Sequence, residues 1–121
     1  AMQVPSAYRI DSYVINSGNV ISATANLTLE RDGEKKRSVA VGDGPVDAAF
    51  LAIEQIIGHH YELDDFQIQT VTEGREAMGS ALVKLRANGK LYSGNGISTD
   101  IIGASIRAYI SALNKIVYEE T

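Results

Sequence analysis

The sequence contains no cysteine, so it can form no disulfide and offers no thiol nucleophile and no thiolate ligand for a metal. It has no apolar run near the roughly 20 residues that a membrane-spanning helix needs, and no signal-peptide pattern. We therefore expect a cytoplasmic protein without a membrane partner. Acidic residues outnumber basic ones by 15 to 11, and the only basic run, Lys35–Arg37, lies beside a predicted turn. No nucleic-acid partner is expected from this charge pattern.

Catalytic arrangements are missing as well. The two histidines, His59 and His60, are adjacent, so in an extended segment they would point to opposite sides. A metal site that adds Glu62 and Asp64 is one interpretation, but no second cluster completes it, and a solvated connector is the simpler one. The glycine-rich turns lack the Gly-Lys-Ser/Thr of a phosphate-binding loop and the third glycine of a dinucleotide fingerprint. The sequence thus predicts no catalytic residue, no metal ligand and no cofactor.

What the sequence does contain is an internal repeat. Alternating residues and turn signals predict strands at 8–16, 20–31, 34–41, 66–73, 77–86 and 90–94. Asp32-Gly33 and Asn88-Gly89 are strong hairpin signals, and apolar residues at helical spacing follow each group of strands. We predict an α+β fold of duplicated β-β-β-α units, with two three-stranded antiparallel sheets and two helices related by a pseudo-two-fold axis. Repeat one covers 8–58 and repeat two covers 61–119, and residues 1–7 are interpreted as a vector-derived remnant and linker.

The same patterns predict local details. Alternation in the first strand places Ile10 and Val14 on one face. Residues 59–65 are predicted to be a connector and 74–76 a turn. Gly58 is expected to end the first helix, and Ser98 or Thr99 to cap the second.

Two glycine-rich segments are the most distinctive feature of the chain. Gly42–Asp47 and Gly94–Asp100 each follow a strand-like run and open an apolar helix, and the repeat aligns them as Gly-x-Gly turns. Helix starts expose backbone N–H groups that suit a carboxylate, and glycines let a ligand approach closely. Asp47 or Asp100 could favour a cation, which together with apolar neighbours describes an aliphatic amino acid. In the alternative interpretation, the glycines only satisfy tight turns and the aspartates only cap helices.

These segments resemble the C-terminal regulatory domain of 2-isopropylmalate synthases. Gly42–Ala49 is similar to the "G-[ND]-G-P-V-D-A" turn of that family, and Gly94–Ser105 is similar to its second signature. Further matches follow at 17–19, 23–25, 108–109 and 112–114. The resemblance covers roughly Tyr8 to Val117.

The resemblance implies that the chain is not itself an enzyme but the regulatory domain, residues 8–121, of an acyltransferase. That parent enzyme condenses acetyl-CoA with 2-oxoisovalerate on a TIM barrel that uses a divalent metal, at the first committed step of leucine synthesis. In this family the domain forms a homodimer, binds leucine as feedback inhibitor near the dimer interface, and acts on the catalytic domain of the same polypeptide. The implied leucine site consists of Gly42, Gly44, Val46, Leu63, Phe66, Thr70, Ala77, Gly79, Gly96, Ile97, Thr99 and Asp100.

Two alternatives stay open. The sister family, citramalate synthase, has a similar domain that senses isoleucine, and one branched methyl distinguishes the two ligands by about 1–3 kcal/mol in a shaped pocket. The Gly-Pro-Val-Asp-Ala turn favours isopropylmalate synthase. The second alternative is a dimerisation module without a ligand response.

Overall fold

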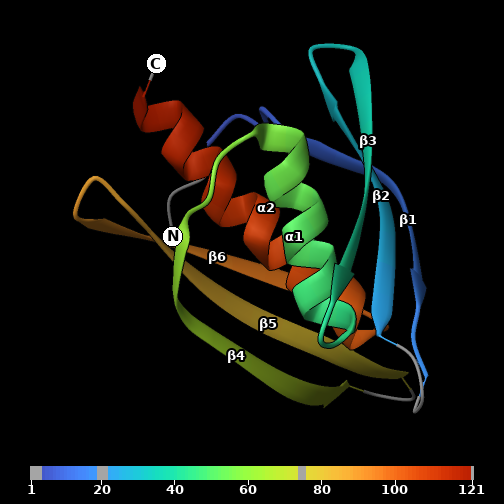
Figure 1. Cartoon of the computed structure of the whole chain (residues 1–121). Coiled ribbons are helices and arrows are strands. Elements are labelled where there is room, and N and C mark those ends of the chain that lie inside the picture. The colour runs from blue at the N-terminus through green and yellow to red at the C-terminus, as the bar shows by residue number, and fades with distance from the viewer. Residues whose placement is uncertain (1–3, 19–21, 74–75, 121) are drawn as a thin grey trace. The chain divides into compact units, whose positions relative to one another are not determined.

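The computed structural model describes residues 4–18, 22–73 and 76–120. The chain divides into two compact units, 8–60 and 61–120 with residues 4–7, and each follows the predicted order of three strands and one helix (Figure 1). The predicted fold class, α+β with duplicated β-β-β-α units and two three-stranded antiparallel sheets, is confirmed. The pseudo-two-fold relation of the units stays a prediction.

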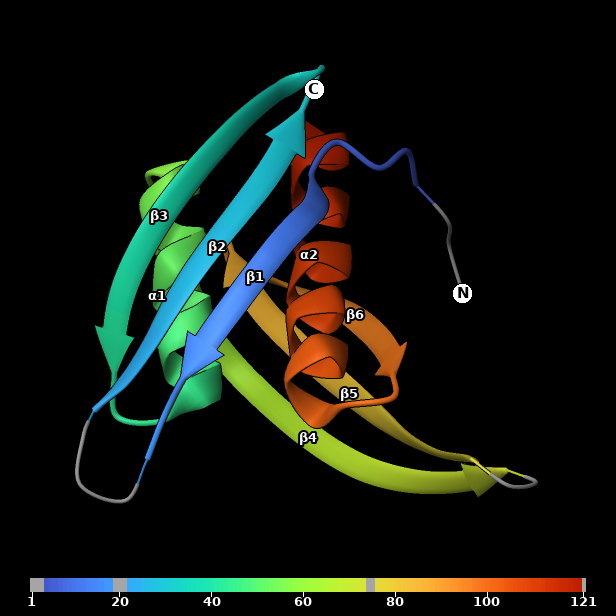
Figure 2. The ribbon, with the colours of Figure 1, turned by 90° about the vertical axis from the view of Figure 1, so that its right-hand side faces the viewer.

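The first unit is a sheet in the order β1-β2-β3 with α1 on one face (Figure 2). Its elements are β1 (Arg9–Asn16), β2 (Ala23–Arg31), β3 (Glu34–Gly42) and α1 (Pro45–Ile57). Every second residue of β2 is buried on the face that α1 covers. The buried apolar residues of this unit are Ala23, Ala25, Leu27, Leu29, Ala40, Ala48, Ala49, Phe50, Ala52 and Ile53. Gly58 follows α1 in the left-handed conformation, φ 71°, so the predicted helix end is confirmed.

A β-bulge in β1 changes which side chains face the core. The register with β2 shifts between Ile10 and Ser12, so Asp11 is an extra residue in the strand. Beyond the bulge, Tyr13 pairs with a buried leucine of β2, and Val14 is 59% exposed. The prediction that Ile10 and Val14 share a face is therefore wrong, because the extra residue reverses the alternation.

The second unit repeats this plan. It consists of β4 (Glu62–Glu73), β5 (Glu76–Ala87), β6 (Lys90–Ser98) and α2 (Ile101–Glu120), and α2 packs on β5 and β6 (Figure 2). β4 has its own bulge at Asp64, the position that corresponds to Asp11 in β1. The buried apolar residues of this unit are Ala81, Val83, Leu85, Ala87, Ala104, Ile106, Ala108, Tyr109, Ile110, Ala112, Leu113 and Ile116.

Three boundaries differ from the sequence prediction. β4 begins at Glu62, so residues 62–65 belong to a strand and not to the connector. The predicted turn at 74–76 is changed, because Glu76 begins β5; residues 74 and 75 lie outside the described residues. The predicted start of the second strand, at 20–21, also lies outside the described residues. β6 continues to Ser98, so Gly94–Gly96 lies inside a strand and is not a turn.

The strand registers align β2 and β3 with β5 and β6 at an offset of 56 residues, whereas β1 and β4 align at an offset of 53. Ala23 pairs with Gly42, and Gly79 pairs with Ser98. Gly42 therefore corresponds to Ser98, and Gly44 corresponds to Asp100. The predicted equivalence of the two Gly-x-Gly segments is wrong, because β3 and β6 are both 9 residues long and only β3 ends in glycine.

Candidate functional site

The turn between β3 and α1 is packed tightly on its own helix. Gly42 is buried, and a Cβ on it would lie 2.5 Å from the amide nitrogen of Ala48, so α1 occupies the space of a side chain. The N–H of Asp43 donates a hydrogen bond to Oδ2 of Asp47 at 2.9 Å. This packing accounts for the residue types at 42 and 47 without a ligand.

The N-terminus of α1 is open. Gly44 is its N-cap, with an extended φ of −148°, and among the described residues no side chain accepts a hydrogen bond at this cap. A Cβ on Gly44 would have no atom beyond its chain neighbours within 4 Å. Pro45 has no N–H, and the N–H of Ala48 donates to the Gly44 carbonyl at 2.9 Å, which leaves the N–H groups of Val46 and Asp47 without an intrahelical acceptor. With the helix dipole, these two groups stabilise a carboxylate placed beside Gly44.

The N-terminus of α2 is closed by its own carboxylate. Asp100, the counterpart of Gly44, accepts a hydrogen bond from the N–H of Gly103 at its Oδ1, 2.7 Å away. The N–H of Ala104 donates to the Asp100 carbonyl at 3.1 Å, so Asp100 is the N-cap. The prediction that Ser98 or Thr99 caps this helix is therefore wrong. The two units thus have opposite helix starts, one open to an anion and one already satisfied.

The glycines of β6 serve the packing of α2. A Cβ on Gly96 would lie 2.2 Å from the carbonyl oxygen of Ala104, and one on Gly94 would lie 2.1 Å from that of Ala108. Gly79 is less confined, since its Cβ would meet Ile101 at 3.3 Å. Of the glycines in the predicted leucine site, only Gly44 has open space beside it.

The structure brings some of the other predicted residues together. Thr70 of β4 pairs with Gly79 of β5, and Gly79 pairs with Ser98 of β6, at the end of the sheet where α2 begins. Thr99 and Asp100 follow directly, so these positions form one cluster in the second unit.

The remaining predicted residues lie elsewhere. Leu63 and Phe66 pair with buried residues farther along β5, on the face that carries α2. Ile97 pairs with Ser80, faces the opposite side of the sheet and is 62% exposed. Ala77 lies in β5, and its side chain is outside the described part of the structure. Gly42, Gly44 and Val46 belong to the first unit.

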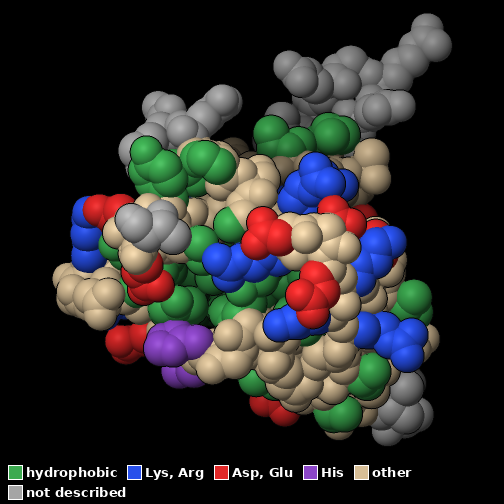
Figure 3. Space-filling view, turned by 90° about the horizontal axis from the view of Figure 1, so that it is seen from above, with side chains coloured by type: hydrophobic (Ala, Val, Ile, Leu, Met, Phe, Trp, Pro, Cys, Tyr) green, Lys and Arg blue, Asp and Glu red, His purple; other side chains and the backbone are tan. Residues whose placement is uncertain are grey.

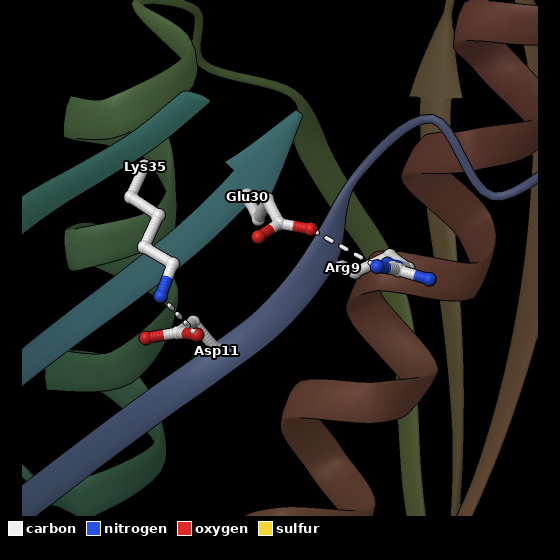
Figure 4. Close-up of polar contacts among 4 residues, drawn as sticks. All are labelled: Arg9, Asp11, Glu30 and Lys35. Carbon is white, nitrogen blue, oxygen red and sulfur yellow. Dashed lines mark hydrogen bonds and ion pairs between the residues drawn. The ribbon is translucent and has the colours of Figure 1, made fainter. Parts of the chain in front are cut away.

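The bulges position charged residues that the sequence reasoning missed. Arg9 pairs with Glu30 at 3.0 Å, and Lys35 pairs with the bulge residue Asp11 at 3.3 Å. Figure 4 shows both pairs. In the second unit the bulge residue Asp64 accepts hydrogen bonds from Arg86 at 3.0 and 3.1 Å. These bonds lower the pKa of Asp64 and raise the pKa of Arg86. A bulge leaves no periodic signal in the sequence. The only sequence signal for the two bulges is an aspartate near the start of each strand, Asp11 in β1 and Asp64 in β4.

A second charged cluster fastens the end of α2 to β6. Nζ of Lys90 donates to Oε1 of Glu119 at 2.6 Å, and Tyr92 bonds the same carboxylate. The hydrogen bonds from Lys90 and Tyr92 lower the pKa of Glu119 and raise the pKa values of both partners. Nζ of Lys115 donates to the Ser93 carbonyl at 2.5 Å, so three hydrogen bonds join the last turns of α2 to β6.

The described residues offer little for other ligand classes. In 4–18, 22–73 and 76–120, no group of three or more His, Asp and Glu side chains is placed to hold a metal ion. In the same ranges, neither helix combines the length and the apolar character needed to span a bilayer. Basic and acidic side chains are interspersed on the face drawn in Figure 3, which does not favour a polyanion.

Fold and site together define a duplicated β-β-β-α module with one open helix start. The chain belongs to the family described as the LeuA allosteric (dimerisation) domain, whose model matches residues 1–117. It is similar to proteins named 2-isopropylmalate synthase from Ruminiclostridium cellulolyticum (45% identity over 96% of the chain), Carboxydothermus hydrogenoformans (42% over 97%) and Heliobacterium modesticaldum (44% over 95%). The chain spans 22–23% of the length of these relatives. The family resemblance inferred from the two glycine-rich segments is confirmed.

Proposed function

We propose that this chain is the regulatory domain of a 2-isopropylmalate synthase, in which it binds leucine as feedback inhibitor and forms a homodimer. The observation that carries the proposal is the match of the LeuA allosteric (dimerisation) family model to residues 1–117. The open start of α1 supports an amino-acid ligand, because the N–H groups of Val46 and Asp47 suit its carboxylate. The residues inferred from the resemblance remain the proposed leucine site.

The proposed parent protein is an acyltransferase that joins acetyl-CoA to 2-oxoisovalerate with a divalent metal held by its catalytic domain. Leucine would bias the regulatory dimer between arrangements, and the rest of the polypeptide would carry that bias to the catalytic centre. The expected location stays the cytoplasm.

Titration calorimetry with leucine, isoleucine and valine tests the ligand. We expect leucine to bind most tightly and to raise the melting temperature. Tighter binding of isoleucine would support the citramalate synthase alternative. Absence of both heat and thermal shift with all three at millimolar concentration would refute amino-acid sensing.

Sedimentation tests the second part of the proposal. We expect a dimer with and without leucine. A dimer that responds to none of the three amino acids would support a dimerisation module alone. Gly79→Val is informative here, because it adds bulk beside the Thr70 and Ser98 cluster. It should abolish leucine binding in a sensor and change no ligand profile in a module without sensing.

A further inference from the structure

A hollow lies at the hairpin end of the first unit, beyond the end of α1. Its floor includes Leu29 of β2 and Ile56 of the last turn of α1. Charged and aromatic side chains surround it: Tyr8, Arg31, Asp32, Glu34 and Lys36. The hollow has a volume of about 140 Å³. A cavity of about 150 Å³ accommodates a benzene molecule, so this space suits one branched aliphatic side chain or one ring.

The hollow exists because α1 is shorter than α2. α1 has 13 residues and α2 has 20. With the offset of 56 residues between the units, Ile57 at the end of α1 corresponds to Leu113. Residues 114–120 of α2 therefore have no counterpart in the first unit. The face of the β2–β3 hairpin that these residues would cover is the face that lines the hollow.

In the second unit, the equivalent face of the β5–β6 hairpin is covered, and the covering residues of α2 show which chemistry suits such a surface. In its last turns α2 buries Ile116 completely, at 0% exposure. Glu119 accepts a hydrogen bond from Lys90, and Tyr92 bonds the same carboxylate. The covering segment is thus an amphipathic helix that directs a branched aliphatic side chain inward and a carboxylate to the hairpin strand. Lys90 and Tyr92 correspond to Glu34 and Lys36 in the first unit.

One wall of the hollow is already fixed. Nη1 of Arg31 donates to the Tyr8 hydroxyl at 2.9 Å, and the guanidinium lies 4.8 Å from the centre of the Tyr8 ring. Lys36 differs, since no ion pair joins it to any residue in the described ranges. Its sequence neighbour Lys35 points to the other face of the sheet, where it pairs with Asp11. Lys36 is thus a cation beside an apolar floor, and it forms no ion pair with the carboxylates of the described residues, Asp32 and Glu34 of the same hollow included.

We propose that this hollow receives an amphipathic helical segment of the same polypeptide from outside these 121 residues. The segment places one branched aliphatic side chain on Leu29 and Ile56 and a carboxylate against Lys36. The inference rests on the proposed function, since it assigns the surface through which the regulatory domain contacts the rest of its enzyme. A segment of the parent is the occupant because the chain spans only 23% of the length of its relative from R. cellulolyticum, and regulation requires contact with the remainder.

Charge reversal in the full-length protein tests the proposal, with Lys36→Glu as the variant and Lys35→Glu as the matched control. Both replace one positive charge with one negative charge at an exposed position of the same strand, but on opposite faces. Calorimetry on the 121-residue chain alone, which lacks the segment, should show the same leucine affinity for both variants, because no docking is coupled to leucine binding there. The leucine concentration that half-inhibits the enzyme should rise about 5-fold or more for Lys36→Glu only, within the usual range of coupling between sites. Equal inhibition curves for the two variants would overturn the proposal.

Photo-crosslinking identifies the occupant independently. A benzoylphenylalanine at position 36 of the full-length protein should form a crosslink, located by mass spectrometry, to a segment outside these residues, and one at position 35 should not. A crosslink to a second copy of this domain, or no crosslink specific to position 36, would overturn the proposal. Failure of the proposed function is a separate result, because it appears as loss of leucine binding in the unsubstituted protein.

Discussion

Replacing Gly44 with aspartate gives α1 the cap that Asp100 already gives α2. The position tolerates the change, because its φ of −148° suits any residue and an added Cβ has no neighbour within 4 Å. A capping aspartate exceeds glycine by a few tenths of a kcal/mol, and a negative charge at a helix start adds about 0.3–1 kcal/mol. Repulsion from Asp43 and Asp47 offsets part of the gain. We expect a net stabilisation of about 0.5 kcal/mol, seen as a rise of roughly 2–3 °C in Tm.

The same substitution should weaken leucine binding. The new carboxylate would accept the N–H groups of the first turn and would repel the ligand carboxylate that we place there. We expect Kd to rise about tenfold or more, which corresponds to about 1.4 kcal/mol. Gly44→Asn is the matched control, since it caps the helix without a charge and should weaken leucine less than Gly44→Asp. Calorimetry and thermal unfolding on the same samples give both quantities.

Two results would refute this reasoning separately. A more stable Gly44→Asp protein with unchanged leucine affinity would show that the ligand carboxylate does not lie at the start of α1. A less stable Gly44→Asp protein would show that the backbone at position 44 requires glycine, and that the open helix start is not the reason for glycine there. A loss of leucine affinity together with a loss of folding would be resolved by the Gly44→Asn control.

Three further predictions concern packing, capping and pH. Gly96→Ala should lower the free energy of unfolding, measured in urea, by about 1–3 kcal/mol, because the added Cβ would lie 2.2 Å from the Ala104 carbonyl oxygen. A decrease below about 0.5 kcal/mol would contradict the close packing of α2 on β6. Asp100→Ala should cost about 0.5–2 kcal/mol in the same assay, whereas Asp100→Asn should retain most of the stability because it preserves the cap. The pKa of Glu119 is lowered from the usual 4.5, so its contribution to stability is present above that pH and is lost as the pH falls through the lower folded value. An NMR titration should show the Glu119 carboxyl ionising below pH 4.5, Glu119→Gln should remove this acid-side loss, and an unshifted titration would contradict the bonds from Lys90 and Tyr92.

The order of elements could be predicted because its signals are local. Asp32 and Gly33 have φ values of 54° and 78°, and Asn88 and Gly89 have values of 54° and 75°. These are the positive φ angles that a two-residue hairpin requires and that Asn, Asp and Gly adopt most readily. Helical apolar spacing and the left-handed Gly58 fixed α1 in the same way. Each of these features depends on residues within one turn or one strand.

The wrong predictions concern positions where a residue distant in sequence determines the orientation, the size or the role of a side chain. The bulge at Asp11 depends on the register with β2, so the alternation of β1 could not reveal it. The glycines at 94 and 96 resemble a turn in sequence, but the backbone of α2 excludes a side chain there. The role of Asp100 as a cap, rather than Ser98 or Thr99, depends on where β6 ends, which the register with β5 determines.

The two repeats share a fold, and their differences are concentrated in the first unit. α2 has a start capped by Asp100 and an end whose Glu119 side chain bonds Lys90 of β6, so side-chain bonds are made at both of its ends within its own unit. α1 has an uncapped start at Gly44 and a hollow beyond its last turn at Ile56. A 13-residue helix is about 20 Å long, so the proposed leucine carboxylate and the proposed docking surface lie at opposite ends of one rigid element. If leucine shifts α1 along its sheet, the shape of the hollow changes with it, and the segment in the hollow then differs in affinity between the two states. Such a difference in affinity is the condition that any ligand-driven shift in population must meet.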